Sequence, residues 1–230
     1  MNKKIFFIVA IIFGVIVIGG GVASQTFFKA PIENFKVERK LEGNKQGLDL
    51  YSELKGIEKK NVEKNYTDPG LILALAFEWK SLGEVTKDSY FFEKSLEIYK
   101  MGIEKFPGNV TFYWNAGKVA ELVQDYGQAE FFYKEAIRVA PTYNEPYHFL
   151  AELYEYRMKK NPEDVFQVYV DGLKVIQNDS SLFLAECSFF QRHDRKDKAL
   201  ECYEILSKAY PNEQLYKKTI AELKQELNKK

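Results

Sequence analysis

Apolar and small residues recur every three or four positions over residues 69–228 of this 230-residue chain. That spacing places their side chains on one face of a helix. The series is clearest at Tyr113, Ala116, Gly117 and Ala120. A turn at 125–127 separates it from a second series that begins at Ala129. The pattern predicts pairs of amphipathic helices joined by short turns.

The second series repeats at a nearly fixed interval. Its tyrosine stands at Tyr99, Tyr133, Tyr169 and Tyr203, at intervals of 34, 36 and 34 residues. A small or modest residue precedes each tyrosine by four positions, at Ser95, Ala129, Val165 and Ala199, and another follows by three, at Gly102, Ala136, Gly172 and Leu206. Small residues allow a neighbouring helix to come close, and the ring fills the space between units. This period indicates a stack of similar units rather than a single globular core.

These landmarks resemble the tetratricopeptide-repeat family, whose unit of about 34 residues combines an early aromatic residue, a leucine–glycine pair and a later alanine–aromatic–alanine–proline series. The best-matching copy spans 110–143, and further copies span about 69–109, 144–179 and 180–213. The resemblance implies an all-α fold, a right-handed α-solenoid of helix–turn–helix repeats. Residues 214–228 are then expected to form a polar cap helix. Residues 50–57 resemble a second helix standing alone.

Three irregularities interrupt the repeat. About seven extra residues around 83–89 predict a longer turn in the first copy. Two extra residues fall near Asn161 and Pro162 in the third copy. In the fourth copy, Glu186 and Cys187 stand where the family favours leucine and glycine, which predicts a weaker first helix.

The N-terminus carries a different signal. Residues 5–23 contain no charge and follow Lys3 and Lys4. As a helix they would span about 28 Å, close to the thickness of the hydrocarbon core. The segment is therefore expected to act as a transmembrane anchor, with a cleaved secretory signal as the alternative. The domain organisation is an anchor or signal segment at 1–24, a polar linker at 25–46 and a repeat domain at 47–230.

Charge at the two ends of this segment predicts its orientation. Lys3, Lys4 and the amino terminus favour a cytoplasmic N-terminus. The repeat domain is therefore expected outside the cytoplasm, on a single-pass membrane protein, or in the medium if the segment is cleaved. Lys29 and Lys36 beyond the segment weaken this bias and leave the reverse orientation open. The short, lysine-led segment favours a bacterial cell envelope.

Composition argues against several functional classes. The chain carries 33 basic and 33 acidic residues, without the basic stripe that nucleic-acid binding favours. It contains no glycine-rich phosphate loop, nucleophile elbow or Cys-x-x-Cys motif. The two histidines, His148 and His193, lie far apart in the sequence, and His193 is expected to be solvated in a turn. We therefore expect no enzyme, no cofactor or metal, and no small-molecule substrate.

Cys187 and Cys202 lie on either side of the last predicted turn, at similar heights on antiparallel helices. A disulfide between them is geometrically possible in an exported protein. It requires Cα atoms closer than about 7 Å, which few helix pairs achieve. Because Cys202 precedes the packing residue Tyr203, we favour two buried thiols over a disulfide.

The predicted binding surface is a concave groove lined by the first helices. In an array that resembles the tetratricopeptide family, the residue after the early aromatic or aliphatic position of each first helix is expected to face the groove. The residues one and two helical turns further along the same helix are expected to face it too. The partner-binding positions are Leu73, Phe77, Trp114, Lys118, Glu121, His148, Glu152, Tyr156, Leu184, Ser188 and Arg192. Trp114 and Phe77 could instead pack in the core. If His148 faces solvent, it is expected to titrate near its ordinary pKa.

A solenoid with such a groove predicts a non-catalytic protein–protein interaction scaffold that binds a peptide or helix of a partner protein. The membrane would be contacted through residues 5–23 alone. The alternative is a structural subunit or assembly factor of a cell-envelope complex.

Overall fold

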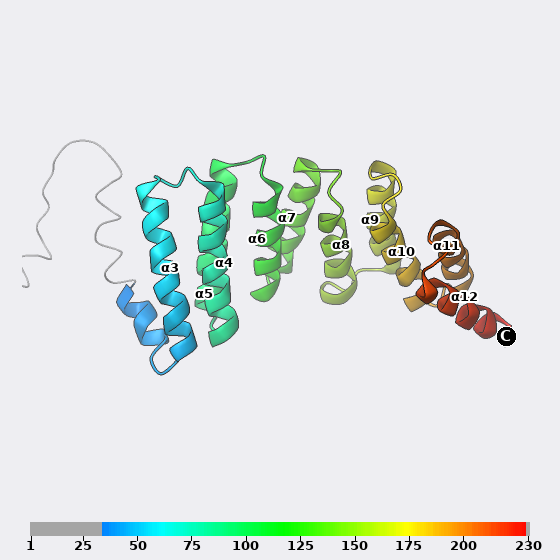
Figure 1. The fold of residues 1–230 in the computed structure, drawn as a ribbon, viewed down its shortest axis with the longest axis horizontal. Helices are drawn as coiled ribbons and strands as arrows, with labels where there is room; N and C mark the ends of the chain where they lie inside the picture. The colour runs from blue at the N-terminus through cyan, green and yellow to red at the C-terminus, as the bar shows by residue number, and fades with distance from the viewer. Residues whose placement is uncertain (1–33, 229–230) are drawn as a thin grey trace, which may run out of the picture. The chain divides into compact units, whose positions relative to one another are not determined.

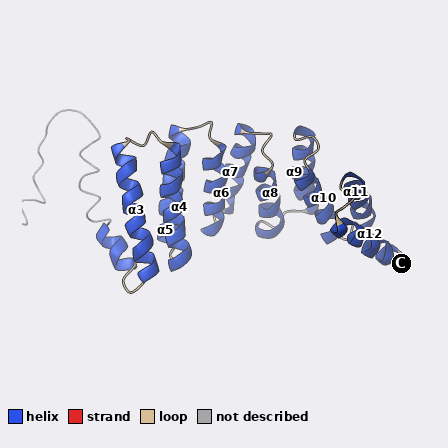
Figure 2. Cartoon of the chain, viewed as in Figure 1, coloured by secondary structure: helices blue, strands red, loops and turns tan. Residues whose placement is uncertain are grey.

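The computed structural model describes residues 34–228, and within them every regular element is a helix. Figure 2 shows the same all-helical composition. Residues 34–40 are helical. The elements that follow are α3 (Lys45–Glu63), α4 (Pro69–Thr86), α5 (Ser89–Lys105), α6 (Val110–Leu122), α7 (Tyr126–Val139), α8 (Glu145–Glu152), η2 (Leu153–Arg157), α9 (Pro162–Val175), α10 (Ser180–Arg192), α11 (Lys196–Ala209) and α12 (Gln214–Leu227).

The described residues divide into two units, residues 34–48 and residues 49–228. In the second unit, each helix from α4 to α12 packs against the next one along the chain. Figure 1 shows these helices following one another in sequence order. Each predicted repeat contains one helix pair, α4 with α5, α6 with α7, α8 and η2 with α9, and α10 with α11. This succession is the expected helical solenoid.

Side chains at the turns determine where most of these helices begin. The N-cap residues Asp68, Asp88, Asn109, Asp125, Asn161 and Asp179 each accept a hydrogen bond from a backbone N–H in the first turn. Those N–H groups have no partner inside the helix, so the caps satisfy them. Pro69 and Pro162 occupy first-turn positions, where proline costs no helical hydrogen bond. Residues in the short connections therefore fix the positions at which these helices begin.

The tyrosines of the repeat are buried, as predicted, and so are the small residues four positions before them. Two glycines show how tightly the helices pack. A Cβ atom on Gly102 would overlap the ring of Phe112 in the next unit, and one on Gly117 would overlap the ring of Tyr133. Ser95 is buried too, and its hydroxyl donates to the carbonyl of Ala76 at 2.7 Å. Close approach of backbone to aromatic ring therefore recurs along the array.

The extra residues of the first repeat do not lengthen its turn, so that prediction was wrong. They extend the helices instead, since α4 and α5 have 18 and 17 residues whereas α6 and α7 have 13 and 14. The added turns stay helical because they continue the apolar face. Leu82 is fully buried, and Gly83 packs against the ring of Phe92. Only residues 87–88 connect the two helices.

The extra residues of the third repeat produce a π-helix. After α8 the chain widens into η2, where the N–H of Met158 donates to the carbonyl of Leu153 at 2.9 Å. Lys159 then adopts a left-handed conformation, and Asn161 caps α9. The insertion is thus absorbed before Asn161. Widened turns of this type shift the direction of the side chains that follow them.

The prediction for the C-terminus is confirmed, whereas one prediction for the N-terminal part was wrong. The cap helix is confirmed as α12, with Leu223 buried. The linker prediction was wrong for its described part, because residues 34–40 are helical and α3 begins at Lys45. The predicted anchor lies outside the described residues. Between residues 34 and 228, no helix is long and apolar enough to cross a membrane.

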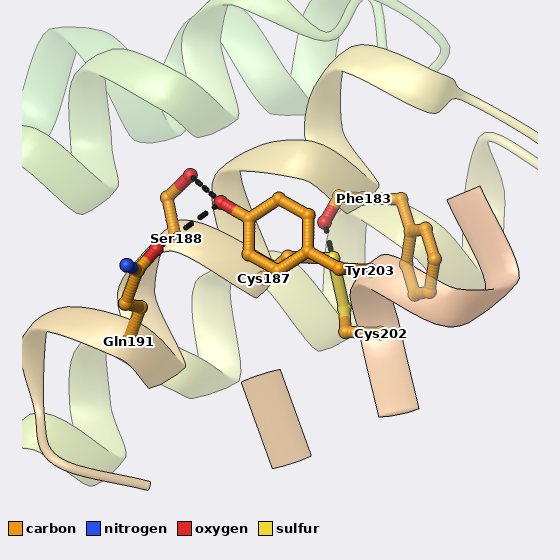
Figure 3. The surroundings of a disulfide bond; sticks show 6 residues. All are labelled: Phe183, Cys187, Ser188, Gln191, Cys202 and Tyr203. Atoms are coloured by element: carbon orange, nitrogen blue, oxygen red, sulfur yellow. Dashed lines mark hydrogen bonds between the residues drawn. A yellow bond between two sulfur atoms is a disulfide. The ribbon is translucent and has the colours of Figure 1, made fainter. Parts of the chain in front are cut away.

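Cys187 on α10 and Cys202 on α11 form a disulfide, so the preference for two thiols was wrong (Figure 3). Their Cα atoms lie 5.4 Å apart, within the range that a disulfide requires. Small residues allow this distance, because Cys187 occupies the position where the family favours glycine, and Ala199 is fully buried one turn before Cys202. Cys202 Sγ also lies 4.0 Å from the carbonyl oxygen of Phe183 on α10. Its position next to Tyr203 therefore does not turn it away from α10.

Candidate functional site

The first helices of three consecutive units carry a connected set of the predicted groove residues. These helices are α6, α8 with its extension η2, and α10. Side chains from neighbouring units contact each other at an aromatic cluster near α6 and at an ionic cluster near α10. The candidate site is this set of contacts.

The aromatic cluster consists of Trp114, Tyr133 and Phe149. Trp114 and Phe149 stack with ring centroids 5.6 Å apart and planes 14° apart, and Tyr133 lies 5.7 Å from Phe149. The ammonium group of Lys118 lies 4.4 Å from the Phe149 centroid and 5.1 Å from that of Trp114. Offset aromatic stacking and cation–π contacts of this kind hold side chains in place. Lys118 itself is exposed.

Trp114 is neither a free groove-floor residue nor a core residue. It is half-buried and packs against the core. Its indole Nε1 is buried, and no residue in the described part of the chain accepts a hydrogen bond from it. An unsatisfied buried donor costs about 1–3 kcal/mol, which makes this N–H an unusual feature of a folded protein.

The ionic cluster centres on Glu155 in η2. Arg192 of α10 donates from Nε to Glu155 Oε1 at 2.9 Å and from Nη2 to Oε2 at 2.8 Å. His193 Nε2 lies 3.2 Å from Glu155 Oε1. The Arg192 guanidinium also lies 5.8 Å from the ring of Tyr156. Arg192 and Tyr156 therefore lie close together, but Arg192 is already engaged by Glu155.

A second carboxylate, Glu121, connects the aromatic cluster to η2. Glu121 Oε1 accepts a hydrogen bond from the Tyr133 hydroxyl at 2.5 Å, and Arg157 Nε lies 3.6 Å from Glu121 Oε2. Burial, followed by the hydrogen bond to Glu121, raises the pKa of Tyr133. Tyr133 therefore stays neutral, and its hydroxyl donates a hydrogen bond to Glu121.

His148 is only partly exposed. Its Nε2 lies 3.1 Å from Ser181 Oγ of α10. Burial lowers the pKa of His148, and the opposing effect of Asp179, Glu152 and Glu145 does not compensate. The condition for an ordinary pKa, a solvated imidazole, is therefore not met. His148 acts as a neutral contact between units.

His193 departs from the sequence prediction. It was expected to be a solvated turn residue, but it is only partly exposed. Its ring centroid lies 4.3 Å from that of Phe189, in addition to its contact with Glu155. The ring is thus fixed between an aromatic face and a carboxylate.

The remaining predicted residues have simpler surroundings. Leu73 and Leu184 are partly buried against the core. Phe77 is 51% exposed, with the Lys80 ammonium 5.0 Å from its ring. Ser188 shares a hydrogen bond with the Tyr203 hydroxyl at 3.2 Å (Figure 3). Glu152 is exposed.

Sequence reasoning missed Phe149, Arg157 and His193 as members of the site. Phe149 directly follows His148, so strict helical spacing assigns it to another face. Arg157 is the last residue of the π-helical turn η2, which changes the register that the spacing assumes. A proton-transfer or metal centre does not emerge from this set, and residues 34–228 contain no group of three His, Cys, Asp or Glu side chains placed to hold a metal ion.

No family model and no curated protein matches this sequence. Solved structures with the same fold do match. A tetratricopeptide repeat protein from Parabacteroides merdae superimposes with a TM-score of 0.56 at 15% identity, over 84% of this chain and 74% of that one. TTC0263, a tetratricopeptide protein of Thermus thermophilus, gives 0.51 at 18% identity, over 81% and 97%.

A third structure is YrrB, described as a tetratricopeptide protein with an unusual peptide-binding site. It gives a TM-score of 0.50 at 16% identity, over 74% of this chain and 83% of that one. These similarities show that the chain has the tetratricopeptide-repeat fold.

We predict that Glu155→Gln destabilises the protein by about 1–2 kcal/mol at pH 7, because it weakens charged hydrogen bonds. Burial raises the pKa of Glu155, but hydrogen bonds and charge from Arg192 and His193 outweigh it and lower the pKa below the ordinary 4.5. A carboxyl with a lowered folded-state pKa stabilises above its ordinary pKa, and this stability is lost as the pH falls through the folded value. Melting curves should therefore show parent and variant converging below pH 4.5.

Glu222→Gln on α12 is the control, because Glu222 is well exposed and 3.8 Å from Lys218. Its melting temperature should stay close to that of the parent, both at pH 7 and below pH 4.5. A difference in melting temperature between the parent and Glu155→Gln that persists unchanged below pH 4.5 would contradict the stabilising role of the charged Glu155 carboxylate.

Proposed function

We propose that this protein is a non-catalytic scaffold, tethered to a membrane by residues 5–23, that binds a peptide or helix of a partner protein across α6, α8 and α10. The tetratricopeptide fold presents its first helices side by side, which suits a surface that recognises an extended or helical segment. The peptide-binding site described for YrrB is consistent with this role.

The observation that carries the proposal is the indole N–H of Trp114. It is a buried donor with no acceptor among the described residues, next to the exposed Lys118. Because this N–H is covered by the chain's own atoms, a partner would have to displace the side chains over it to bring in a carbonyl or carboxylate oxygen. That oxygen would satisfy the N–H, and the partner would cover the stacked rings of Trp114 and Phe149. Aromatic anchors at the centre of an interface typically supply much of its binding energy.

Two observations support an extracytoplasmic location. Residues 5–23 are uncharged and follow two lysines. The disulfide between Cys187 and Cys202 is typical of oxidising compartments and rare in the cytosol. Together they favour repeats exposed outside the cytoplasm of an envelope protein.

A structural subunit of an envelope complex is the second candidate. Ile205, Tyr210 and Leu215 are exposed on the last two helices and the turn between them. Leu173, Phe183, Ile205 and Tyr210 also line a cavity of about 410 Å³. Large apolar side chains gathered in this way are typical of surfaces that contact another protein. A permanent neighbour at this end would favour the structural role.

Two substitutions at Trp114 test the scaffold. Trp114→Phe should leave the melting temperature unchanged or slightly higher, because it removes the unsatisfied N–H and keeps a stacked ring. It should nevertheless weaken capture of the partner by about 1 kcal/mol, since the donor is lost. Trp114→Ala should weaken capture by about 2 kcal/mol or more and also lower the melting temperature.

The measurement is photo-crosslinking of partners in intact membranes, with purified variants melted in parallel. Phe131→Ala removes a 57% exposed aromatic ring from α7 and serves as the control, with unchanged capture. Partner capture by Trp114→Phe and Trp114→Ala at the parent level would exclude Trp114 from the binding surface.

The membrane tether predicts that the protein stays in the membrane fraction after washing with sodium carbonate. Alkylation of free thiols before lysis should leave Cys187 and Cys202 unmodified, because the disulfide forms outside the cytoplasm. A soluble mature form that begins near Ser24 would contradict the anchor and indicate a cleaved signal. Quantitative alkylation of both cysteines would contradict the extracytoplasmic location.

A further inference from the structure

A second cavity of about 410 Å³ opens between α7 and α9, the second helices of two consecutive units. Its lining residues are Lys134 and Ile137 of α7, Tyr147, Leu150 and Tyr154 of α8 and η2, and Lys160, Asp164, Gln167, Val168 and Asp171 of α9 and the loop before it. The volume is in the range of ligand-binding pockets. The cavity has an apolar floor and charged walls.

This cavity is separate from the groove discussed above. Successive residues of a helix point about 100° apart. On α8, Tyr147 and Leu150 face the cavity, whereas His148 and Glu152 project from the opposite side of the same helix. A ligand in the cavity would therefore contact the outer face of the array, away from Trp114.

The basic wall of the cavity is held in place by a shared carboxylate. Glu130 Oε1 accepts hydrogen bonds from Lys134 Nζ at 2.7 Å, from the Tyr154 hydroxyl at 2.7 Å and from Lys160 Nζ at 3.0 Å. The Lys160 ammonium also lies 3.8 Å from the centroid of the Tyr154 ring. Two ammonium groups thus share one carboxylate, which leaves one positive charge uncompensated within the cluster.

The α9 side of the cavity also carries acidic residues. Asp164 and Asp171 lie two turns apart on α9, and both line the cavity with Gln167 between them. Asp171 accepts from Gln167 Nε2 at 2.7 Å and lies 3.3 Å from Lys174 Nζ. Asp164 accepts from Asn161 Nδ2 at 2.8 Å. The side with Lys134 and Lys160 therefore attracts an acidic group, whereas the side with Asp164 and Asp171 attracts a basic group.

The η2 insertion produces this arrangement. The widened turn places Tyr154 against Glu130, and the loop after it carries Lys160 over the Tyr154 ring. π-helical turns inserted into α-helices occur frequently at functional sites. In the second repeat, by comparison, α6 leads directly into α7 through residues 123–125.

We propose that this outer cavity is a second protein-docking site, which takes a peptide segment with one large apolar side chain flanked by an acidic and a basic residue. The apolar side chain lies on Ile137, Leu150 and Val168. The acidic residue pairs with Lys134 and Lys160, whose combined charge exceeds that of Glu130. The basic residue faces Asp164 on the α9 wall.

The test is a selection of 12-residue peptides from a phage-displayed library on the full chain in lipid nanodiscs, with counter-selection against Lys134→Met. Lys134 is 55% exposed and Glu130 keeps Lys160 and Tyr154 as partners, so the substitution is expected to preserve the fold. The surviving peptides should carry an acidic residue within four positions of a large apolar residue. Their synthetic versions should bind Lys134→Met about three- to fivefold more weakly than the parent, as an ion pair of modest strength implies.

Lys218→Met on α12 is the matched control, because it removes the same charge from a 75% exposed side chain elsewhere. Lys218→Met should bind the peptides like the parent. The parent, Lys134→Met and Lys218→Met should have the same melting temperature. Trp114→Ala should also retain binding, since the groove lies on the other side of α8. The proposal is overturned if no peptide survives counter-selection, if the survivors lack an acidic residue, or if their binding depends on Trp114 rather than Lys134.

Discussion

The packing of an aromatic ring directly against a neighbouring helix backbone is the interaction on which this architecture depends. Tyr133 lies on the backbone at Gly117 within one unit, and Phe112 lies on the backbone at Gly102 across the boundary to the previous unit. A side chain at either glycine would force the helices apart. The same contact inside units and between them makes the array continuous. Stability in such an array comes from each unit and its nearest neighbours.

This constraint also positions the two candidate surfaces. Because the second helices carry the buried tyrosines, the first helices place side chains such as Trp114 and His148 on the other side, next to their counterparts in neighbouring units. The Tyr133 hydroxyl extends from the core to Glu121, so core packing and surface electrostatics are coupled at that point. The π-helical insertion after α8 changes the spacing only locally, and it is there that the outer cavity opens.

The repeat could be predicted from sequence because its signal is redundant. Tyrosines, small residues and prolines share one register, and the structure buries the tyrosines and small residues together. The insertions could not be placed, because a helix can lengthen, widen or loop out with the same composition. Residues 83–86 continued the apolar face and stayed helical, whereas the third repeat widened at 153–157. The disulfide was missed because spacing alone does not reveal a Cα separation of 5.4 Å. Site chemistry was predicted least well, since the lowered pKa of His148 and the engagement of Arg192 by Glu155 depend on contacts across units.

The most direct test of the central packing contact compares two helical glycines. A Cβ atom added to Gly56 on α3 would meet no atom within 4 Å, whereas one added to Gly102 on α5 would meet the ring of Phe112. Helix propensity alone favours alanine over glycine by about 0.5–1 kcal/mol, so Gly56→Ala should raise the free energy of unfolding in urea. Gly102→Ala should lower it by about 1–3 kcal/mol, because the added methyl group overpacks the contact. If Gly56→Ala and Gly102→Ala raised the free energy of unfolding equally, the Phe112 ring would pack equally well against a side chain at position 102. That result would contradict this account of the fold.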